Sequence, residues 1–231
     1  MHRGWILGAV ALLLLGAVGG LTAILLGTHR APAPLALGSP AVSAAATSLA
    51  GTWKVTSGSE AGYRVREQFI NQPAPTEAVA RTSKVTGGLK VLDSGPGLAV
   101  TDIHVAVELA SLQSQDRYAT YQVYQRDFFI RTIYLQTDQY STADFTASVF
   151  NLPQGLGSDA VSVAVAGKLN LHGITKSVIT QLQAQRSGTG VEIVGSISVD
   201  MRDFGIEVPS ISFTKAEPAA VIEYKLALIR A

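Results

Sequence analysis

The chain has 231 residues, of which 47% are hydrophobic, 15% are charged and none is cysteine, and its formal net charge is +1. This length allows one or two domains, and the lack of cysteine excludes disulfide scaffolds, thiol catalysis and cysteine-ligated metal centres. The near-zero charge argues against nucleic-acid binding, because proteins that bind nucleic acids carry a basic surface.

The hydrophobic residues are concentrated near the N-terminus. A short tail over residues 1–4 is followed by residues 5–27, which contain no charged side chain. In a helix that rises about 1.5 Å per residue, this run is long enough to cross a hydrocarbon core of about 30 Å. We therefore predict a single transmembrane helix over residues 5–27, with the short N-terminal tail inside the cell.

A cleaved signal peptide is the alternative for this segment, although the apolar run exceeds the roughly 7–15 residues typical of such peptides. Both alternatives place the remainder of the chain outside the cytoplasm: at the cell membrane if the segment is retained, and secreted or periplasmic if it is cleaved. Residues 28–50 are rich in Ala, Pro and Ser, so we expect a semi-rigid linker.

The remaining domain, residues 51–231, is nearly neutral and shows the pattern of β-strands. Apolar residues occupy every second position around 103–109, 162–171, 191–201 and 222–228, and Gly-rich turns separate these runs. A period of two with one apolar face is typical of half-buried strands. We expect residues 178–186 and 191–201 to form a hairpin, and the whole domain to form an antiparallel barrel or sandwich.

Two segments depart from the strand pattern. Residues 112–133 contain scattered large apolar side chains and predict one helix, short or broken. Residues 69–86 are polar and read as irregular.

The chain lacks the recognisable signatures of catalysis and metal binding. No nucleophile elbow, zinc-protease, Walker or Rossmann motif is present. His104 and His172 lie on the polar face or at the end of predicted strands without metal-ligand spacing. Paired carboxylates occur only beside turns, where Asp is common. We therefore expect neither an enzyme nor a bound cofactor or metal.

Four segments together resemble the YceI-like family over about residues 51–230. They are Gly51-Thr52-Trp53-Lys54-Val55, Arg126-Asp127 followed by Tyr140 and Phe145, the run from Gly167 to Lys176 (GKLNLHGITK), and Arg202-Asp203-Phe204-Gly205-Ile206. The resemblance implies an all-β, eight-stranded antiparallel lipocalin-like barrel with a short helix against it. It also implies a secreted or periplasmic protein, and some members hold a polyisoprenoid chain in an apolar tunnel.

Strand alternation then predicts which side chains would contact a ligand inside the barrel. Gly167 and Gly195 would leave local space, and Arg126 and Arg202, with Arg131, would meet a polar headgroup at the mouth. The expected apolar lining consists of inward residues of the predicted strands: Val105, Val107, Val163, Val165, Leu169, Leu171, Ile193, Ile197, Tyr224 and Leu226.

These observations predict a membrane-anchored extracytoplasmic protein that binds a polyisoprenoid or fatty apolar ligand. A filled barrel that serves as a ligand-free structural or interaction module of the cell envelope is the alternative. The sequence leaves the oligomeric state open, a homodimer included.

Overall fold

A computed structural model describes residues 30–39, 48–70, 72–95, 97–117, 123–152, 156 and 159–231. The transmembrane helix expected over residues 5–27 lies outside these ranges. Among the residues that are described, no helix is both long enough and apolar enough to cross a bilayer.

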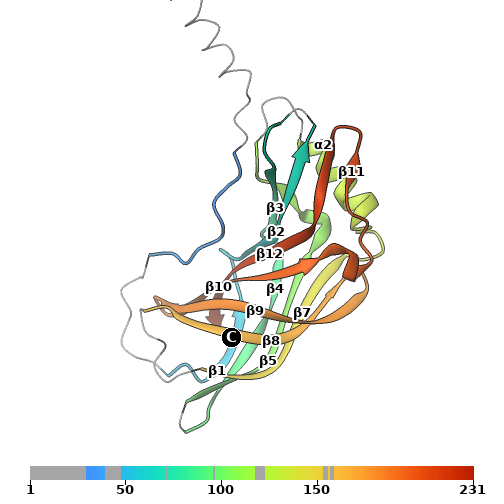
Figure 1. The fold of residues 1–231 in the computed structure, drawn as a ribbon. Coiled ribbons are helices and arrows are strands. Elements are labelled where there is room, and N and C mark those ends of the chain that lie inside the picture. Colours follow the sequence, from blue (N-terminus) through green and yellow to red (C-terminus); the bar gives the residue numbers. More distant parts are fainter. Residues whose placement is uncertain are drawn as a thin grey trace, which may run out of the picture.

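Within the described chain, eight antiparallel strands close into a barrel (Figure 1), as the family resemblance implied. Closure pairs the edges of the sheet, which an open sheet would leave exposed for aggregation. Around the ring the strands are β1 (Gly51–Val55), β4 (Val85–Asp93), β5 (Leu98–Glu108), β7 (Thr142–Leu152), β8 (Val161–Leu171), β9 (Ile174–Ser187), β10 (Gly190–Asp200) and β12 (Thr214–Arg230), which returns to β1.

The long strand β12 extends the barrel at one end. Its C-terminal end pairs with β1, and the rest pairs with β2 (Glu60–Phe69). On its other edge β2 pairs with β3 (Thr76–Thr82), and β3 in turn pairs with β6 (Gln113–Ser114). The register with β2 shifts between Ala216 and Ala220, where Pro218 has no N–H to donate. The short strand β11 (Ser210–Ile211) folds back on the start of β12.

The expectation of an irregular segment over residues 69–86 is wrong, because β3 and the start of β4 lie there. The inward positions of β3 are small, with Ala78 and Ala80 both buried. Small residues weaken the contrast between apolar and polar faces, so the period-two pattern could not be recognised in the sequence.

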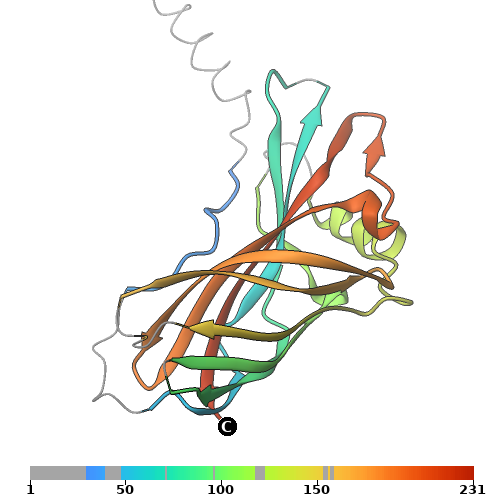
Figure 2. The same cartoon turned by 60° about the horizontal axis from the view of Figure 1, so that its bottom comes forward.

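The helix-forming region is shorter than the range 112–133 suggested. The described helix α2 (Val123–Phe129) continues as the π-helical turn η2 (Ile130–Tyr134). Short 3-10 turns, η1 (Leu109–Ser111) and η3 (Met201–Phe204), complete this end of the molecule. Figures 1 and 2 show α2 beside the hairpin of β11 and β12, so this end of the barrel is called the helix end below.

The predicted alternation holds along the wall. In β8, Val165, Leu169 and Leu171 are buried, whereas Ala166 and Lys168 between them are exposed. The hairpin of β9 and β10 also forms as expected, with Ser187 opposite Gly190. The inner face therefore carries the apolar side chains that strand parity assigned to it.

Candidate ligand-binding cavity

An apolar cavity of about 320 Å³ occupies the helix end of the barrel. It reaches the surface between α2 and the β11–β12 hairpin, where the lining residues Phe129, Ile133 and Ile211 are 47%, 52% and 46% exposed. The remaining apolar lining comes from β2, β5, β7, β8, β10, β12, η1, η2 and their flanks, and includes Val65, Val107, Leu109, Leu112, Ile130, Leu135, Leu171, Val199, Met201, Ile206 and Ile222.

Small side chains on the wall create this space. Strand positions that could carry Val, Leu or Ile carry Ala instead, and the pairing of each strand with its neighbours around the closed barrel holds the backbones in place. Each missing side chain therefore leaves volume rather than a collapsed core. The small lining residues of this kind are Ala61, Ala78, Ala143, Ala216 and Ala220.

A single cluster of charged groups borders the cavity. Arg126, on α2, points its Nη1 at the Glu67 carboxylate, 3.1 Å away, and its Nη2 contacts both Asp116 and the Ser114 hydroxyl. Asp127 accepts hydrogen bonds from the Ser114 N–H and hydroxyl. These bonds join α2 to β2 and β6.

Burial changes the proton affinities in this cluster. It raises the pKa of Glu67, against the opposing effect of the Arg126 guanidinium, and it also raises the pKa of the Tyr63 hydroxyl. Burial alone lowers the pKa of Arg126, but the hydrogen bond to Asp116 and the nearby carboxylates outweigh it and raise the pKa overall. The guanidinium thus stays charged, with acidic partners already on both terminal nitrogens.

The middle of the barrel is filled. A Cβ on Gly167 would lie 2.4 Å from the ring of Phe145, and a Cβ on Gly195 would lie 2.3 Å from the hydroxyl of Tyr224. The Tyr224 hydroxyl is 2.6 Å from the Thr180 hydroxyl, and burial raises the pKa of Tyr224 to about 12. The expectation that these glycines leave space for a ligand is wrong, because aromatic rings from neighbouring strands occupy it.

The end of the barrel opposite the helix, called the far end below, is also packed. Only about 40 Å³ of space lies there, around Trp53, Phe150 and Leu182. Trp53 is 3% exposed and donates its indole N–H to the carbonyl of Leu49, 2.8 Å away, which places the buried Leu49 in the same hydrophobic cluster. The interior space of the described barrel is therefore concentrated at the helix end.

Comparison with known families agrees with this architecture. The model of the YceI-like domain matches residues 53–227. The chain belongs to the YceI-like family.

Solved structures share its fold. A polyisoprenoid binding domain from Saccharophagus degradans, implicated in plant cell wall breakdown, is 15% identical with a TM-score of 0.55, over 79% of this chain and 99% of that one. BcnA of Burkholderia cenocepacia is 15% identical with a TM-score of 0.48, over 71% and 95%. A YceI protein of Campylobacter jejuni is 12% identical with a TM-score of 0.40, over 70% and 83%. No curated protein matches the chain.

The side chains that strand parity selected in this YceI-like domain divide among three regions. Val107 and Leu171 line the helix-end cavity, and Ile193 lines the small space at the far end, where Val163 also packs. The others fill the barrel without lining the large cavity: Leu169 in the helix-end cluster, Val105, Tyr224 and Leu226 in the middle cluster, and the buried Val165 and Ile197.

The three arginines that were expected to contact a headgroup at the mouth lie in different surroundings. Arg126 is buried in the cavity wall, whereas the Arg202 side chain is 67% exposed and pairs with Asp200. Arg131 donates to the carbonyl of Leu112, 2.9 Å away. Arg202 is not among the lining residues.

Sequence reasoning missed the contribution of the helix and of the alanines. Phe129, Ile130, Ile133 and Tyr134 all line the cavity, and their spacing along one helical turn was a usable signal. The alanines at inward strand positions were a second signal, which was overlooked because lining residues were sought among large side chains.

Neither predicted-strand histidine contributes to the cavity lining. His104 lies 3.0 Å from the Asp144 carboxylate, and the Nδ1 atom of His172 lies 3.1 Å from the carbonyl of Phe204. The described residues contain no group of three or more His, Asp or Glu side chains placed to hold a metal ion.

Proposed function

We propose that this protein holds a polyisoprenoid or a similar long apolar chain in the helix-end cavity. The observation that carries the proposal is an apolar cavity reaching the surface, in a barrel whose other half is filled. The Saccharophagus degradans domain with the same fold is described as polyisoprenoid-binding, which supports the ligand class. Binding rather than catalysis is proposed, because the charged groups at the cavity bond to one another.

The size of the cavity limits what enters it. A cavity of roughly 150 Å³ takes one benzene ring, so a space of about 320 Å³ takes on the order of ten to fifteen carbon atoms. At ~0.8 kcal/mol per methylene, ten buried groups supply about 8 kcal/mol before the entropy of binding is subtracted. A polyisoprenoid would therefore place only the last few units of its apolar end inside and leave the rest beyond the mouth.

We also propose that residues 5–27 anchor the protein in the cell membrane with the domain outside the cytoplasm. The support is the length and the uncharged composition of this segment. An anchored protein would meet polyisoprenoids in the bilayer, where they are concentrated, rather than in water.

The proposal is tested by comparing the lipids that accompany two variants of the full chain. Ala143 lines the cavity, and Ala143→Phe would fill it, whereas Ala164 on β8 is exposed on the outer wall, so Ala164→Phe is the matched control. Each protein is purified in polymer-bounded membrane discs, and its lipids are quantified by mass spectrometry against those of discs without the protein.

We expect prenyl lipids to be enriched about tenfold or more with the parent chain and with Ala164→Phe, and not with Ala143→Phe. Equal lipid profiles for all three proteins and the empty discs would contradict the proposal and favour a ligand-free interaction module.

A further inference from the structure

We propose that the helix end of the barrel docks on the bilayer surface, so that the cavity opens directly into the lipid. This inference rests on the membrane anchor and the apolar ligand proposed above. It adds a docking surface, a lipid bilayer as its partner, and a segment of the chain that sets the orientation.

The docking surface is a rim of exposed apolar side chains around the mouth, here called the apolar rim. Phe128 and Phe129 of α2 lie in edge-to-face contact with ring centroids 5.7 Å apart, and Ile133 follows one turn later. The complete rim, with its exposed fractions, is Ile70 (72%), Phe128 (57%), Phe129 (47%), Ile133 (52%), Ile211 (46%) and Phe213 (42%).

These side chains come from three separate parts of the chain but meet at one end. Ile70 ends β2 and donates its N–H to the carbonyl of Phe213, 3.0 Å away, across the β2–β12 pairing. Ile211, Phe129 and Ile133 line the same cavity. Figure 1 shows the ends of β2 and β3, the β11–β12 hairpin and α2 at the same end of the barrel. Large apolar groups gathered around a pocket are typical of an interaction surface.

The N-terminal strap, residues 30–39, fixes where the chain reaches the barrel. Its first residue, Arg30, pairs with Arg117 through two backbone hydrogen bonds of 3.2 and 3.0 Å. Arg117 directly follows Asp116, which bonds Arg126 in the cavity wall. The strap therefore begins at the helix end, and in Figure 1 its blue ribbon runs from there along the outside of the barrel.

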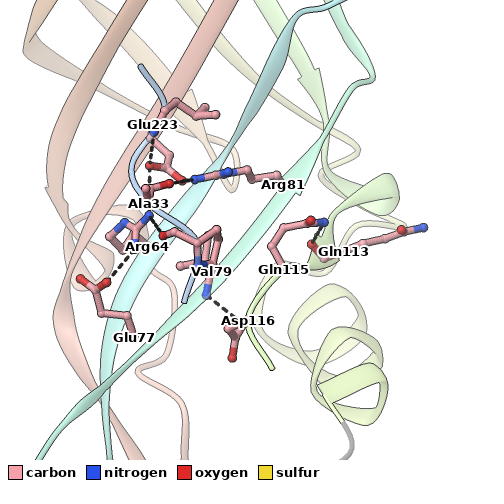
Figure 3. Close-up of polar contacts among 11 residues, drawn as sticks. Ala33, Arg64, Glu77, Val79, Arg81, Gln113, Gln115, Asp116 and Glu223 are labelled. Carbon is pink, nitrogen blue, oxygen red and sulfur yellow. Dashed lines mark hydrogen bonds and ion pairs between the residues drawn. The ribbon is translucent and has the colours of Figure 1, made fainter. Parts of the chain in front are cut away.

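Buried polar side chains hold the strap against the wall. Arg64 donates to the carbonyl of Pro32 and Arg81 to the carbonyl of Ala33, at 2.9 and 2.7 Å (Figure 3). Glu223 accepts from the N–H of Leu35, at 3.4 Å, and is itself 3% exposed although it lies on the outer face of β12.

Further along, the strap reaches β9 and β10. Gly38 donates its N–H to the Glu192 carboxylate, 2.6 Å away, and accepts a hydrogen bond of 2.8 Å from the Gln185 side chain. Contacts distributed over the strap from end to end hold it as part of the barrel rather than as a free spacer over these residues.

The short length of chain between the uncharged run and the strap supports a bilayer as the partner of the apolar rim. The uncharged run ends at Gly27, three residues before Arg30. Three residues span at most about 11 Å when fully extended. A bilayer that contains residues 5–27 would therefore lie close to the end of the barrel that carries the apolar rim, and not near β1 or the C-terminus.

Charges near the rim are compatible with a lipid surface. Arg30, Arg117 and Lys215 are exposed at this end, where they would face phosphate headgroups. The Arg66 and Glu217 side chains nearby form an exposed pair 3.7 Å apart. The docked geometry also gives the outer part of a long polyisoprenoid an apolar place to remain, since the cavity takes only the last few units of its apolar end.

The absence of native cysteine makes the docking measurable with single introduced labels. Phe213→Cys and Ile133→Cys probe the rim, and Ile179→Cys and Ile229→Cys probe exposed apolar positions on β9 and at the end of β12. Each full-length variant is labelled with an environment-sensitive fluorophore and reconstituted in phosphatidylcholine–phosphatidylglycerol vesicles. Quenching is then measured with lipids that carry a nitroxide high on the acyl chain.

We expect quenching at the two rim positions to exceed that at the two control positions by threefold or more. Equal quenching at all four positions would overturn the docking. The prenyl-lipid enrichment is measured separately on the unlabelled parent chain in membrane discs, as described above, so loss of docking with enrichment retained contradicts only this inference, and docking without enrichment contradicts only the proposed ligand.

The role of the strap is tested by removing its N–H donors without altering the barrel. Leu35→Pro with Gly38→Pro removes the bonds to Glu223 and Glu192, and Ala36→Pro at an exposed position between them is the matched control. We expect the double variant to lose at least half of the excess quenching at the rim, and the control to keep it. Full quenching in the double variant would contradict the orienting role of the strap.

Discussion

The two ends of this barrel are built on the same strand alternation, yet one is filled and the other hollow. At the far end, Trp53, Phe150 and Leu182 leave about 40 Å³, and Leu49 and Leu156 pack against the same cluster. At the helix end, inward alanines of β2, β3, β7 and β12 leave about 320 Å³.

Parity and side-chain volume are therefore separate properties of a strand sequence. Parity decides which side chains enter the barrel, because successive residues point to opposite faces. The size of those side chains and of the neighbours that reach them decides whether space remains. Three experiments test this contrast, and a fourth tests the contact between the strap and the barrel.

The largest effect is expected where the core is fullest. Trp53→Ala would remove a side chain that is 3% exposed, together with its hydrogen bond to Leu49, and should lower the free energy of unfolding by about 3–5 kcal/mol. Ile133→Ala at the cavity mouth, where the side chain is 52% exposed, should cost less than about 1 kcal/mol. Denaturant titration of both variants measures the difference, and similar losses would refute the contrast.

Enlarging an alanine should have opposite consequences at the two ends. Ala184, 3% exposed at the far end, has little free space beside it, so Ala184→Leu should destabilise the protein by about 1–3 kcal/mol through overpacking. Ala220 borders the large cavity, so Ala220→Leu should leave stability within about 1 kcal/mol of the parent or raise it. Thermal unfolding compares the two, and a larger loss for Ala220→Leu would contradict the assignment of free volume.

The packing in the middle of the barrel can be tested by measuring the energetic coupling between Gly167 and Phe145. Gly167→Ala places a Cβ against the Phe145 ring and should cost about 1–3 kcal/mol. Phe145→Leu in the same chain should restore only part of this loss, because it removes the ring that the new methyl group meets but leaves the Thr146 carbonyl, 2.6 Å from that group. A double-mutant cycle measures the coupling, and simple additivity would show that the ring does not fill the glycine site.

The smallest expected effect is on the pH dependence of protein stability that arises from the contact between Glu192 and the strap. Burial alone raises the pKa of Glu192, but hydrogen bonds from Lys225 and from the Gly38 N–H outweigh it and hold the pKa below its ordinary value of 4.5. Because the folded pKa is lowered, the stabilisation is present above pH 4.5 and is lost as the pH falls through the lowered value.

Glu192→Gln should therefore reduce stability by about 0.5 kcal/mol at pH 7 and by less at pH 3. Chemical denaturation at the two pH values checks the sign. A loss that is larger at pH 3 than at pH 7 would contradict the role given to this carboxylate.

The fold was largely predictable because its signals are local. Alternation in the runs that became β8, β10 and β12, and the turn before Gly190, specified strands and a hairpin. The family resemblance supplied the strand number. Strand β3 was missed because Ala78 and Ala80 give almost no contrast between the two faces.

The cavity was less predictable because its position depends on contacts between distant segments. Gly167 is filled by Phe145 of the neighbouring strand, and Gly195 by Tyr224 across the β10–β12 pair. No pattern within one strand reveals such a filling. The binding of the strap by Arg64, Arg81 and Glu223 was equally hidden, since residues 28–50 carried only the composition of a linker.

The most direct test of the hollow helix end is to map where an apolar chain contacts the protein. A 20-carbon prenol with a photoreactive diazirine at its apolar end is added to membranes that contain the full chain, and crosslinked peptides are identified after irradiation. The account predicts crosslinks at cavity-lining residues of the helix end, such as Ala143, Leu171 and Ile222. Crosslinks concentrated around Trp53 and Leu228 at the far end, or none within the barrel, would contradict it.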